Sequence, residues 1–139
     1  MKVKLDEGAK LPVRAHDTDA GYDIFVPTNS NAITVRPHQS AVIDTGVHIA
    51  IPKGYVGFLK AKSGLNVKFN LTGEGVIDSG YTGSIVVKMY NLGDHEYTFI
   101  GGDKLIQIVL LPIYTPELEI VKTLEETERG DKGFGSTGL

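Results

Sequence analysis

The sequence predicts an all-β domain, either a sandwich or a barrel, and three observations support this prediction. Apolar and polar residues alternate with a period of two along much of the chain, which is the pattern of half-buried strands. The alternating runs are short and are separated by Gly, Pro, Asn and Asp, as in antiparallel sandwiches and barrels. Helical periodicity is poor. With 139 residues, of which 41% are apolar and 22% charged, the chain is expected to form one domain with its own core.

The expected strands can be justified in chain order. Residues 1–5 alternate apolar side chains with lysine, and residues 17–25 suggest a turn that leads into a strand. Short runs rich in β-branched and aromatic residues follow between turn residues, and we expect strands in them; they are residues 32–36, 41–51, 55–60, 65–70 and 96–100.

Two later strands have a clearer pattern. Residues 84–91 place Ile85, Val87 and Met89 on one face, so this face is expected to be buried. Residues 104–111 are apolar on both faces except at Gln107, whose amide must find partners or cost about 1–3 kcal/mol. The best helix candidate is 117–128, although its first half also alternates as a strand would.

Composition excludes several classes of protein. A net charge of −3 argues against a nucleic-acid-binding surface, and no apolar run approaches the roughly 20 residues that span a bilayer. The N-terminus has no secretory signal, so a soluble, cytoplasmic protein is expected. Without cysteine there is no disulfide and no thiolate site. The four histidines lack the spacing of a zinc site and are expected at the surface or in packing.

The C-terminal segment has an unusual composition. Residues 129–139 contain four glycines and two cations, with Arg129 at the start and Phe134 set among glycines. Such a segment is either a frayed terminus or a flap that closes over a flat, anionic ligand. The sequence therefore predicts a β domain over residues 1–128 and a mobile arm over residues 129–139.

Several short stretches carry polar groups suited to chemistry. In "AKSGL", Lys62, Ser63 and Gly64 offer an ammonium, a hydroxyl and an unobstructed backbone N–H to phosphate oxygens. The stretch lacks the second glycine of a P-loop, and no helical pattern follows it. Asp78 ends a strand-like run, where it is either a turn residue or a general base. Asp23 and Tyr81 are open to the same two kinds of interpretation, structural or functional.

Five stretches, in this order, resemble the five motifs of the homotrimeric deoxyuridine triphosphatases (dUTPases). They are "AGYDIF", "AKSGL", "GVIDSGYTG", "GDKLIQI" and "RGDKGFGSTG", and together they span residues 20–138. The resemblance implies a β jelly roll with a mobile C-terminal arm, and a homotrimer in which each active site draws on all three subunits. It implies hydrolysis of dUTP to dUMP and pyrophosphate, which limits uracil incorporation into DNA and supplies dUMP for thymidylate synthesis.

The resemblance also implies a role for each matching residue. Asp78 would be the general base for a water that attacks the α-phosphorus, and the ring of Tyr81 would exclude a 2′-hydroxyl. Asp23 would support Mg²⁺ through water. Gln107, which would bind the phosphates and a water, and Arg129, which would reach the phosphates, would be catalytic residues together with Asp78. Lys62, Ser63 and Gly64 would also hold the phosphates. The backbone of residues 75–78 (Gly75, Val76, Ile77 and Asp78) and of Val86 would read uracil. Phe134 would stack on the base, and Gly135, Ser136 and Thr137 would reach the γ-phosphate.

Two alternatives stay open from the sequence. A deoxycytidine triphosphate deaminase, alone or in a bifunctional form, shares the jelly roll and a similar third motif, but it needs a glutamate base. A non-catalytic, dUTP-responsive regulatory protein would keep the pocket as a switch. One departure from the family pattern concerns the second motif, where Lys62 replaces the usual arginine and loses its two-point grip on phosphate.

Overall fold

The computed structural model describes residues 1–133. Within these residues the strands pair antiparallel into four small sheets. The largest sheet has the order β2-β11-β6-β8, the second has the order β4-β9-β7, and two further pairs are β1-β5 and β3-β10. The strands are β1 (Lys2–Leu5), β2 (Gly21–Phe25), β3 (Ile33–Val35), β4 (Ser40–Asp44), β5 (Val47–Ala50), β6 (Tyr55–Lys60), β7 (Leu71–Thr72), β8 (Glu74–Ile77), β9 (Val86–Asn91), β10 (Tyr97–Phe99) and β11 (Lys104–Pro112).

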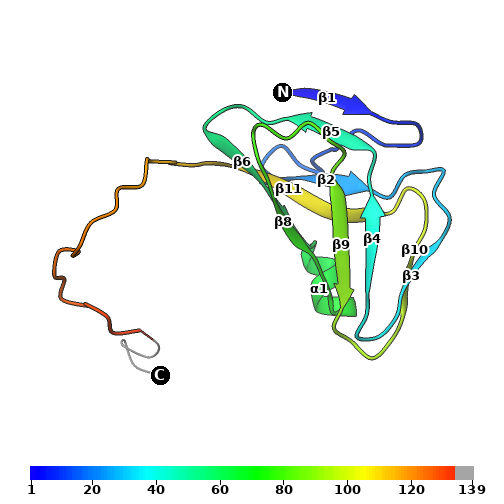
Figure 1. Ribbon diagram of the computed structural model, residues 1–139. Helices are drawn as coiled ribbons and strands as arrows, with labels where there is room; N and C mark the ends of the chain where they lie inside the picture. Colours follow the sequence, from blue (N-terminus) through cyan, green and yellow to red (C-terminus); the bar gives the residue numbers. More distant parts are fainter. Residues whose placement is uncertain (134–139) are drawn as a thin grey trace.

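The core lies between the two larger sheets, which gives the predicted all-β sandwich (Figure 1). The alternation seen in residues 84–91 is confirmed, because Ile85, Val87 and Met89 are each at most 1% exposed. The facing sheet contributes Leu59 from β6 and Ile108 from β11, both buried in the same cluster. Apolar burial of this kind supplies most of the stabilisation of the fold.

The run predicted over residues 41–51 forms two strands rather than one. The chain leaves the β4-β9-β7 sheet after Asp44 and joins β1 through β5. Gly46 makes this possible with φ +65°, a conformation that other residues rarely adopt. The buried Thr45 side chain fixes the switch by donating a hydrogen bond of 2.7 Å to the carbonyl of Ile85. Period-two alternation alone does not reveal such a change of sheet.

The strand predicted over residues 65–70 is wrong, and so is the expectation that no helix follows "AKSGL". A short helix, α1 (Ser63–Phe69), occupies this segment and ends at Asn70 in the left-handed conformation. Leu65, Val67 and Phe69 alternate as in a strand, but only Leu65 is buried, while Val67 is 79% exposed. The burial of Leu65 in the core therefore decides the conformation of this segment, and the local alternation does not.

The helix candidate at 117–128 is also wrong. No helix or strand follows β11 within the described part of the chain, up to residue 133. The apolar side chains of this segment lie in solvent, with Leu118 at 96% and Ile120 at 101% exposure. An isolated helix of this length is marginal in water without a surface to pack on. Within residues 1–133, no helix is long and apolar enough to cross a membrane.

Candidate active site

Asp23, on β2, lies at the centre of a cluster of charges. Its carboxylate is paired with the ammonium groups of two lysines: Lys62 on one oxygen and Lys104, at 2.8 Å, on the other. The Asp23 side chain is only 7% exposed, whereas the lysines are 28% and 45% exposed. Burial alone would raise the pKa of Asp23, but the hydrogen bonds and charges of Lys104 and Lys62 outweigh it and lower this pKa. The cluster combines one anion with two cations, so it attracts a further anion.

The start of α1 places the second predicted stretch beside this cluster. Lys62 precedes the helix with extended backbone angles, and its carbonyl accepts the first helical hydrogen bond, from the N–H of Asn66 at 3.0 Å. Ser63 and Gly64 form the first turn. A Cβ added to Gly64 would meet no atom within 4 Å, so the backbone here is open to a ligand. A cavity of about 330 Å³ runs from Lys62 and Gly64 to Lys104 and Asp103.

Gln107 completes this half of the site. On β11 it lies directly opposite Asp23 of β2 and opposite Lys60 of β6. Its amide Nε2 donates a long hydrogen bond of 3.5 Å to the carbonyl of Ala61, which leaves the amide free to take a stronger partner. Gly21 makes room for it, because a Cβ there would lie 2.5 Å from the Gln107 amide oxygen.

A separate cavity brings the third predicted stretch together. It has a volume of about 200 Å³ and is lined by Val76, Ile77, Asp78, Tyr81 and Val86. The side chains of Val76, Tyr81 and Val86 are 60%, 45% and 48% exposed, which is unusual for large apolar groups. The remaining predicted residue, Gly75, lies within β8 against Leu59. All residues predicted to contact the base and sugar from this stretch therefore lie at or beside one cavity.

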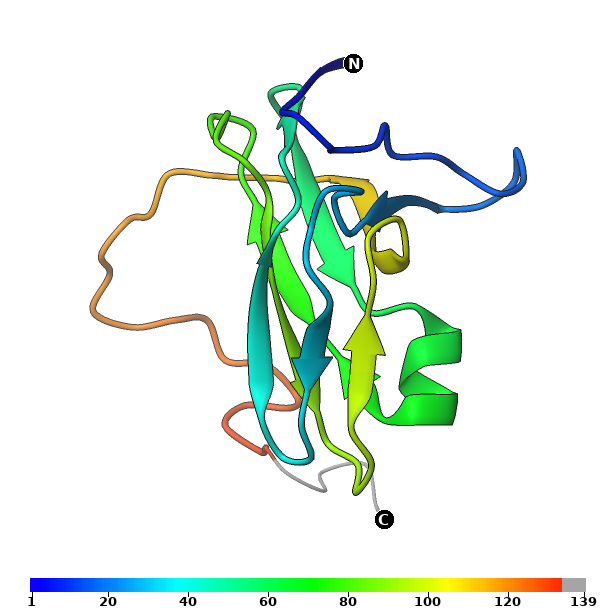
Figure 2. The ribbon, with the colours of Figure 1, turned by 90° about the vertical axis from the view of Figure 1, so that its right-hand side faces the viewer.

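The two halves are far apart within one chain. Lys60 pairs with Glu74, and the chain from Ala61 onward continues away from Asp78. Asp78 follows Glu74 by four residues and comes directly after β8, which runs antiparallel to β6. The rise of a strand therefore places Asp78 about 13 Å from Glu74, on the side away from Ala61. Figures 1 and 2 show α1 and the β8–β9 loop at opposite ends of the sheet. No single small group in this chain can contact both Lys62 and Asp78.

Arg129 lies apart from both halves in this structure. It is exposed, and its Nε donates a hydrogen bond of 3.1 Å to the carbonyl of Lys132 within a turn. Beyond Pro112 the chain leads away from the sandwich (Figure 1). The predicted residues Phe134, Gly135, Ser136 and Thr137 lie outside the described residues.

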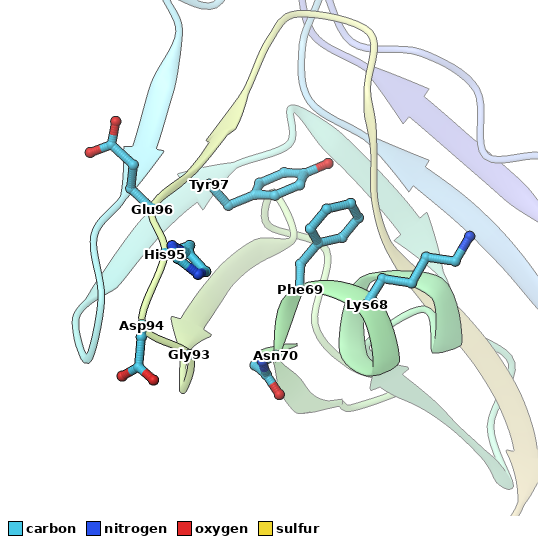
Figure 3. Close-up of a pocket in the computed structure, with 8 residues that line it drawn as sticks. All are labelled: Lys68, Phe69, Asn70, Gly93, Asp94, His95, Glu96 and Tyr97. Atoms are coloured by element: carbon cyan, nitrogen blue, oxygen red, sulfur yellow. The ribbon is translucent and has the colours of Figure 1, made fainter.

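One further pocket contains none of the predicted residues. It measures about 80 Å³ and lies between the end of α1 and the segment that leads into β10 (Figure 3). Its aromatic wall consists of Phe69 and Tyr97, with ring centroids 4.9 Å apart. Burial, followed by the charge of Asp103, raises the pKa of Tyr97. This pocket is small and flanks the cluster around Asp23 without reaching it.

Sequence reasoning missed Lys104 and His48 as site-related residues. Lys104 meets Asp23 because β11 pairs with β2, about eighty positions earlier in the chain. His48 contacts the loop behind Tyr81, at the carbonyl of Thr82, and its side chain is only 15% exposed. Lys104 lies within the fourth motif, so a closer reading of "GDKLIQI" could have included it; no local signal marks His48.

Comparison with known proteins identifies related chains. The dUTPase family matches residues 7–138. A mouse deoxyuridine 5′-triphosphate nucleotidohydrolase is 41% identical over 137 residues, covering 98% of this chain and 83% of the mouse protein. The protein of the same name from Clostridium novyi is 40% identical over 98% of this chain and 96% of its own length.

The solved dUTPase of Staphylococcus bacteriophage 80alpha, with dUPNHPP, superposes with a TM-score of 0.91 at 36% identity, covering 99% of this chain and 98% of that chain. A solved aspartate-to-asparagine mutant of the dUTPase from phage phi11 of S. aureus, which concerns the coordination of a structural Mg(II) ion, superposes with a TM-score of 0.81 at 35% identity, over 90% of this chain and 98% of its own.

Proposed function

The chain belongs to the dUTPase family and is a dUTP diphosphatase, and we propose that Asp78 activates the water that cleaves dUTP into dUMP and pyrophosphate. The jelly-roll prediction is confirmed by the likeness to solved dUTPases. The observation that carries the mechanism is the cavity lined by Val76, Ile77, Asp78, Tyr81 and Val86. The reaction limits uracil incorporation into DNA and supplies dUMP for thymidylate synthesis.

Uracil fits between two strand edges beside this cavity. Within the described residues, β8 pairs only with β6, so the other edge of its backbone is free. Among residues 1–133, β9 pairs with β4 on one side. On its other side it pairs with β7 through Tyr90 and Asn91 alone, so the Val86 end of that side is open. Free N–H and C=O groups at fixed positions form hydrogen bonds with the edge of a base. They discriminate against cytosine, because its amino group reverses one hydrogen bond.

Tyr81 and Asp78 act next to the base. Tyr81 is held by its hydroxyl, which donates a hydrogen bond of 2.8 Å to the carbonyl of Ser84, so the ring has a fixed position. Packed against deoxyribose, the ring leaves no space for a 2′-hydroxyl. The Asp78 side chain is exposed at the rim, where it accepts a proton from water as that water attacks the α-phosphorus. The proton moves to the carboxylate, the new P–O bond forms, and pyrophosphate leaves.

The cluster around Asp23 binds the phosphates. Lys62, the Ser63 hydroxyl, the Gly64 N–H and the Gln107 amide supply cationic and hydrogen-bonding groups for the oxygens. Within residues 1–133 no three His, Asp or Glu side chains gather as a metal cage, which suits an ion carried by the triphosphate and contacted by Asp23 through water. When bound, Mg²⁺ would neutralise phosphate charge and orient the triphosphate. Asp23 would contact it through water if the Lys62 ammonium binds a phosphate oxygen in place of the Asp23 carboxylate.

A complete site requires further copies of the chain, and we propose a homotrimer with shared active sites. The separation of at least about 13 Å between the two halves is bridged when Asp78 of one subunit meets Lys62 of another. Exposed apolar side chains beyond β11, among them Tyr114 at 88% and Leu124 at 86%, gain a surface to pack on in such an assembly. The arm with Arg129 and Phe134 then closes over the nucleotide.

Mixed assemblies test this arrangement. Asp78→Asn and Lys62→Ala, each produced alone, should lose nearly all dUTP hydrolysis. When the two are co-produced as mixed trimers, about one site in four receives an intact Asp78 and an intact Lys62, so activity should return to about that fraction. Absence of any recovery in trimers confirmed by mass would place both groups in one subunit and refute the shared site.

Substrate selection is tested separately. Pyrophosphate and ammonia release should be followed with dUTP, dCTP, dTTP and UTP in the presence of Mg²⁺. We expect pyrophosphate from dUTP alone. Ammonia from dCTP would indicate deaminase activity, and dUTP binding without turnover would indicate a regulatory protein.

A further inference from the structure

Three consecutive residues fix the position of Tyr81. Its ring lies over Gly83, where an added Cβ would come within 2.4 Å of the tyrosine hydroxyl oxygen. Its hydroxyl donates to the carbonyl of Ser84 at 2.8 Å, and the Ser84 hydroxyl binds the carboxylate of Asp44. The third residue, Thr82, has an exposed side chain, so its position depends on its backbone.

The backbone carbonyl of Thr82 is held by His48. Nδ1 of this histidine, on β5, lies 2.8 Å from the carbonyl oxygen, and Nε2 lies 3.0 Å from a carboxylate oxygen of Asp6. A carbonyl and a carboxylate accept hydrogen bonds but cannot donate them. Both ring nitrogens must therefore donate, which requires the doubly protonated imidazolium. The neutral ring can satisfy only one of these two partners.

The hydrogen bonds of His48 favour this state, although two lysines lie nearby. Lys4 lies opposite His48 in the β1-β5 pair and binds the same Asp6 carboxylate at 3.3 Å, while Lys2 lines the adjoining cavity of about 400 Å³. Asp44 is engaged by Ser84 and by the N–H of Gly46. The hydrogen bond to Asp6, followed by that to Thr82, raises the pKa of His48, while partial burial and Lys4 act in the opposite direction. Both bonds are present below the ordinary pKa of histidine, and one of them is lost as the pH rises through the raised value.

We infer that His48 is a positioning residue for sugar selection: as an imidazolium it holds the Thr82 carbonyl, and thereby holds Tyr81 in the orientation that excludes a 2′-hydroxyl. This inference rests on the proposed role of Tyr81. It adds a protonation-dependent element to discrimination between deoxyribose and ribose. The neutral ring keeps its single proton on Nε2, where the carboxylate of Asp6 accepts the stronger hydrogen bond, and Nδ1 then no longer holds the Thr82 carbonyl.

The ratio of kcat/KM for dUTP to kcat/KM for UTP, measured from pH 6 to pH 8.5, tests the inference. The two substrates share base and triphosphate, so their ionisation, and that of Asp78, cancels in the ratio. In the unmodified protein the ratio should fall about fivefold with rising pH, which corresponds to the net value of one hydrogen bond, about 1 kcal/mol. His48→Gln should give a low ratio with no pH dependence. Asp6→Asn should move the midpoint to lower pH.

A matched control is His38→Asn, because His38 also pairs with an aspartate, Asp94 at 3.1 Å. His38 precedes the Ser40 end of β4, whereas the Tyr81 loop leads into β9 at the other end of this strand pair, where Val86 pairs with Asp44. His38 has φ +58°, which asparagine tolerates, and this variant should keep the original pH profile. Long-range ¹H–¹⁵N NMR of the unmodified protein should show both His48 nitrogens protonated at pH 6 and one deprotonated at high pH.

The outcomes separate the two hypotheses. A pH-independent ratio in the unmodified protein, or a His48 ring that is already neutral at pH 6, overturns the role of His48 and leaves the proposed function intact. Equal turnover of dUTP and UTP at every pH removes the role of Tyr81 itself.

Discussion

Replacing Lys104 with methionine tests the charge cluster around Asp23. Methionine keeps the unbranched shape of the side chain but removes the ammonium that lies 2.8 Å from the carboxylate. The Asp23 side chain, 7% exposed, keeps Lys62 as its single cationic partner. A hydrogen bond to a charged group contributes about 1.5–3 kcal/mol, and the 45% exposure of Lys104 reduces this through solvent screening. We expect the free energy of unfolding to fall by about 1–2 kcal/mol at pH 7.

The effect should depend on pH with a defined sign. The pKa of Asp23 is lowered in the folded state, so the stabilisation is complete above the ordinary carboxyl pKa and disappears as pH falls through the lowered value. The difference between the unmodified protein and Lys104→Met should therefore be full at pH 5 and shrink below pH 4. Urea unfolding at a fixed protomer concentration measures it, because assembly makes stability depend on concentration.

Lys60→Met is the matched control. Lys60 also pairs with a carboxylate, Glu74 at 3.0 Å, but both side chains are exposed, at 51% and 74%. Exposed pairs of this kind contribute at most about 1 kcal/mol, and often nothing measurable. Equal losses for Lys104→Met and Lys60→Met would refute the argument from burial. A loss at Lys104 that stays unchanged over the whole acid range down to acid unfolding would refute the pairing with the Asp23 carboxylate.

Three further predictions concern activity. Asp78→Asn should lower kcat by about 10²–10⁴-fold while isothermal titration still shows dUTP binding; unchanged turnover would exclude Asp78 as the base. Gly21→Ala should displace the Gln107 amide, because the new Cβ would lie 2.5 Å from its oxygen, and should raise KM for dUTP with little change in melting temperature; an unaltered KM would show that Gln107 does not bind substrate. Removal of residues 129–139 should abolish most turnover and leave the circular dichroism of the sandwich intact, since the last described strand ends at Pro112; full activity would remove the arm from the mechanism.

Strand predictions succeeded where burial repeats with the period of a strand. Ile85, Val87 and Met89 alternate in the sequence because one face of β9 is buried and the other is not. The same rule failed for residues 65–70, where Leu65 alone is buried and a two-turn helix forms. It also failed to place the break at Gly46, because both strands flanking it alternate and only their partners differ.

The sequence by itself determined the β class of the fold and, through its five short stretches, the family, with dUTP hydrolysis as the activity. Those properties follow from local patterns of residues that are readable along the chain. Tertiary structure alone decided that Lys104 reaches Asp23, that His48 holds the carbonyl behind Tyr81, and that Lys62 and Asp78 lie at opposite ends of one sheet. Each of these depends on pairing between strands distant in sequence, and the energy of such pairing comes from packing across the whole sandwich rather than from any local segment.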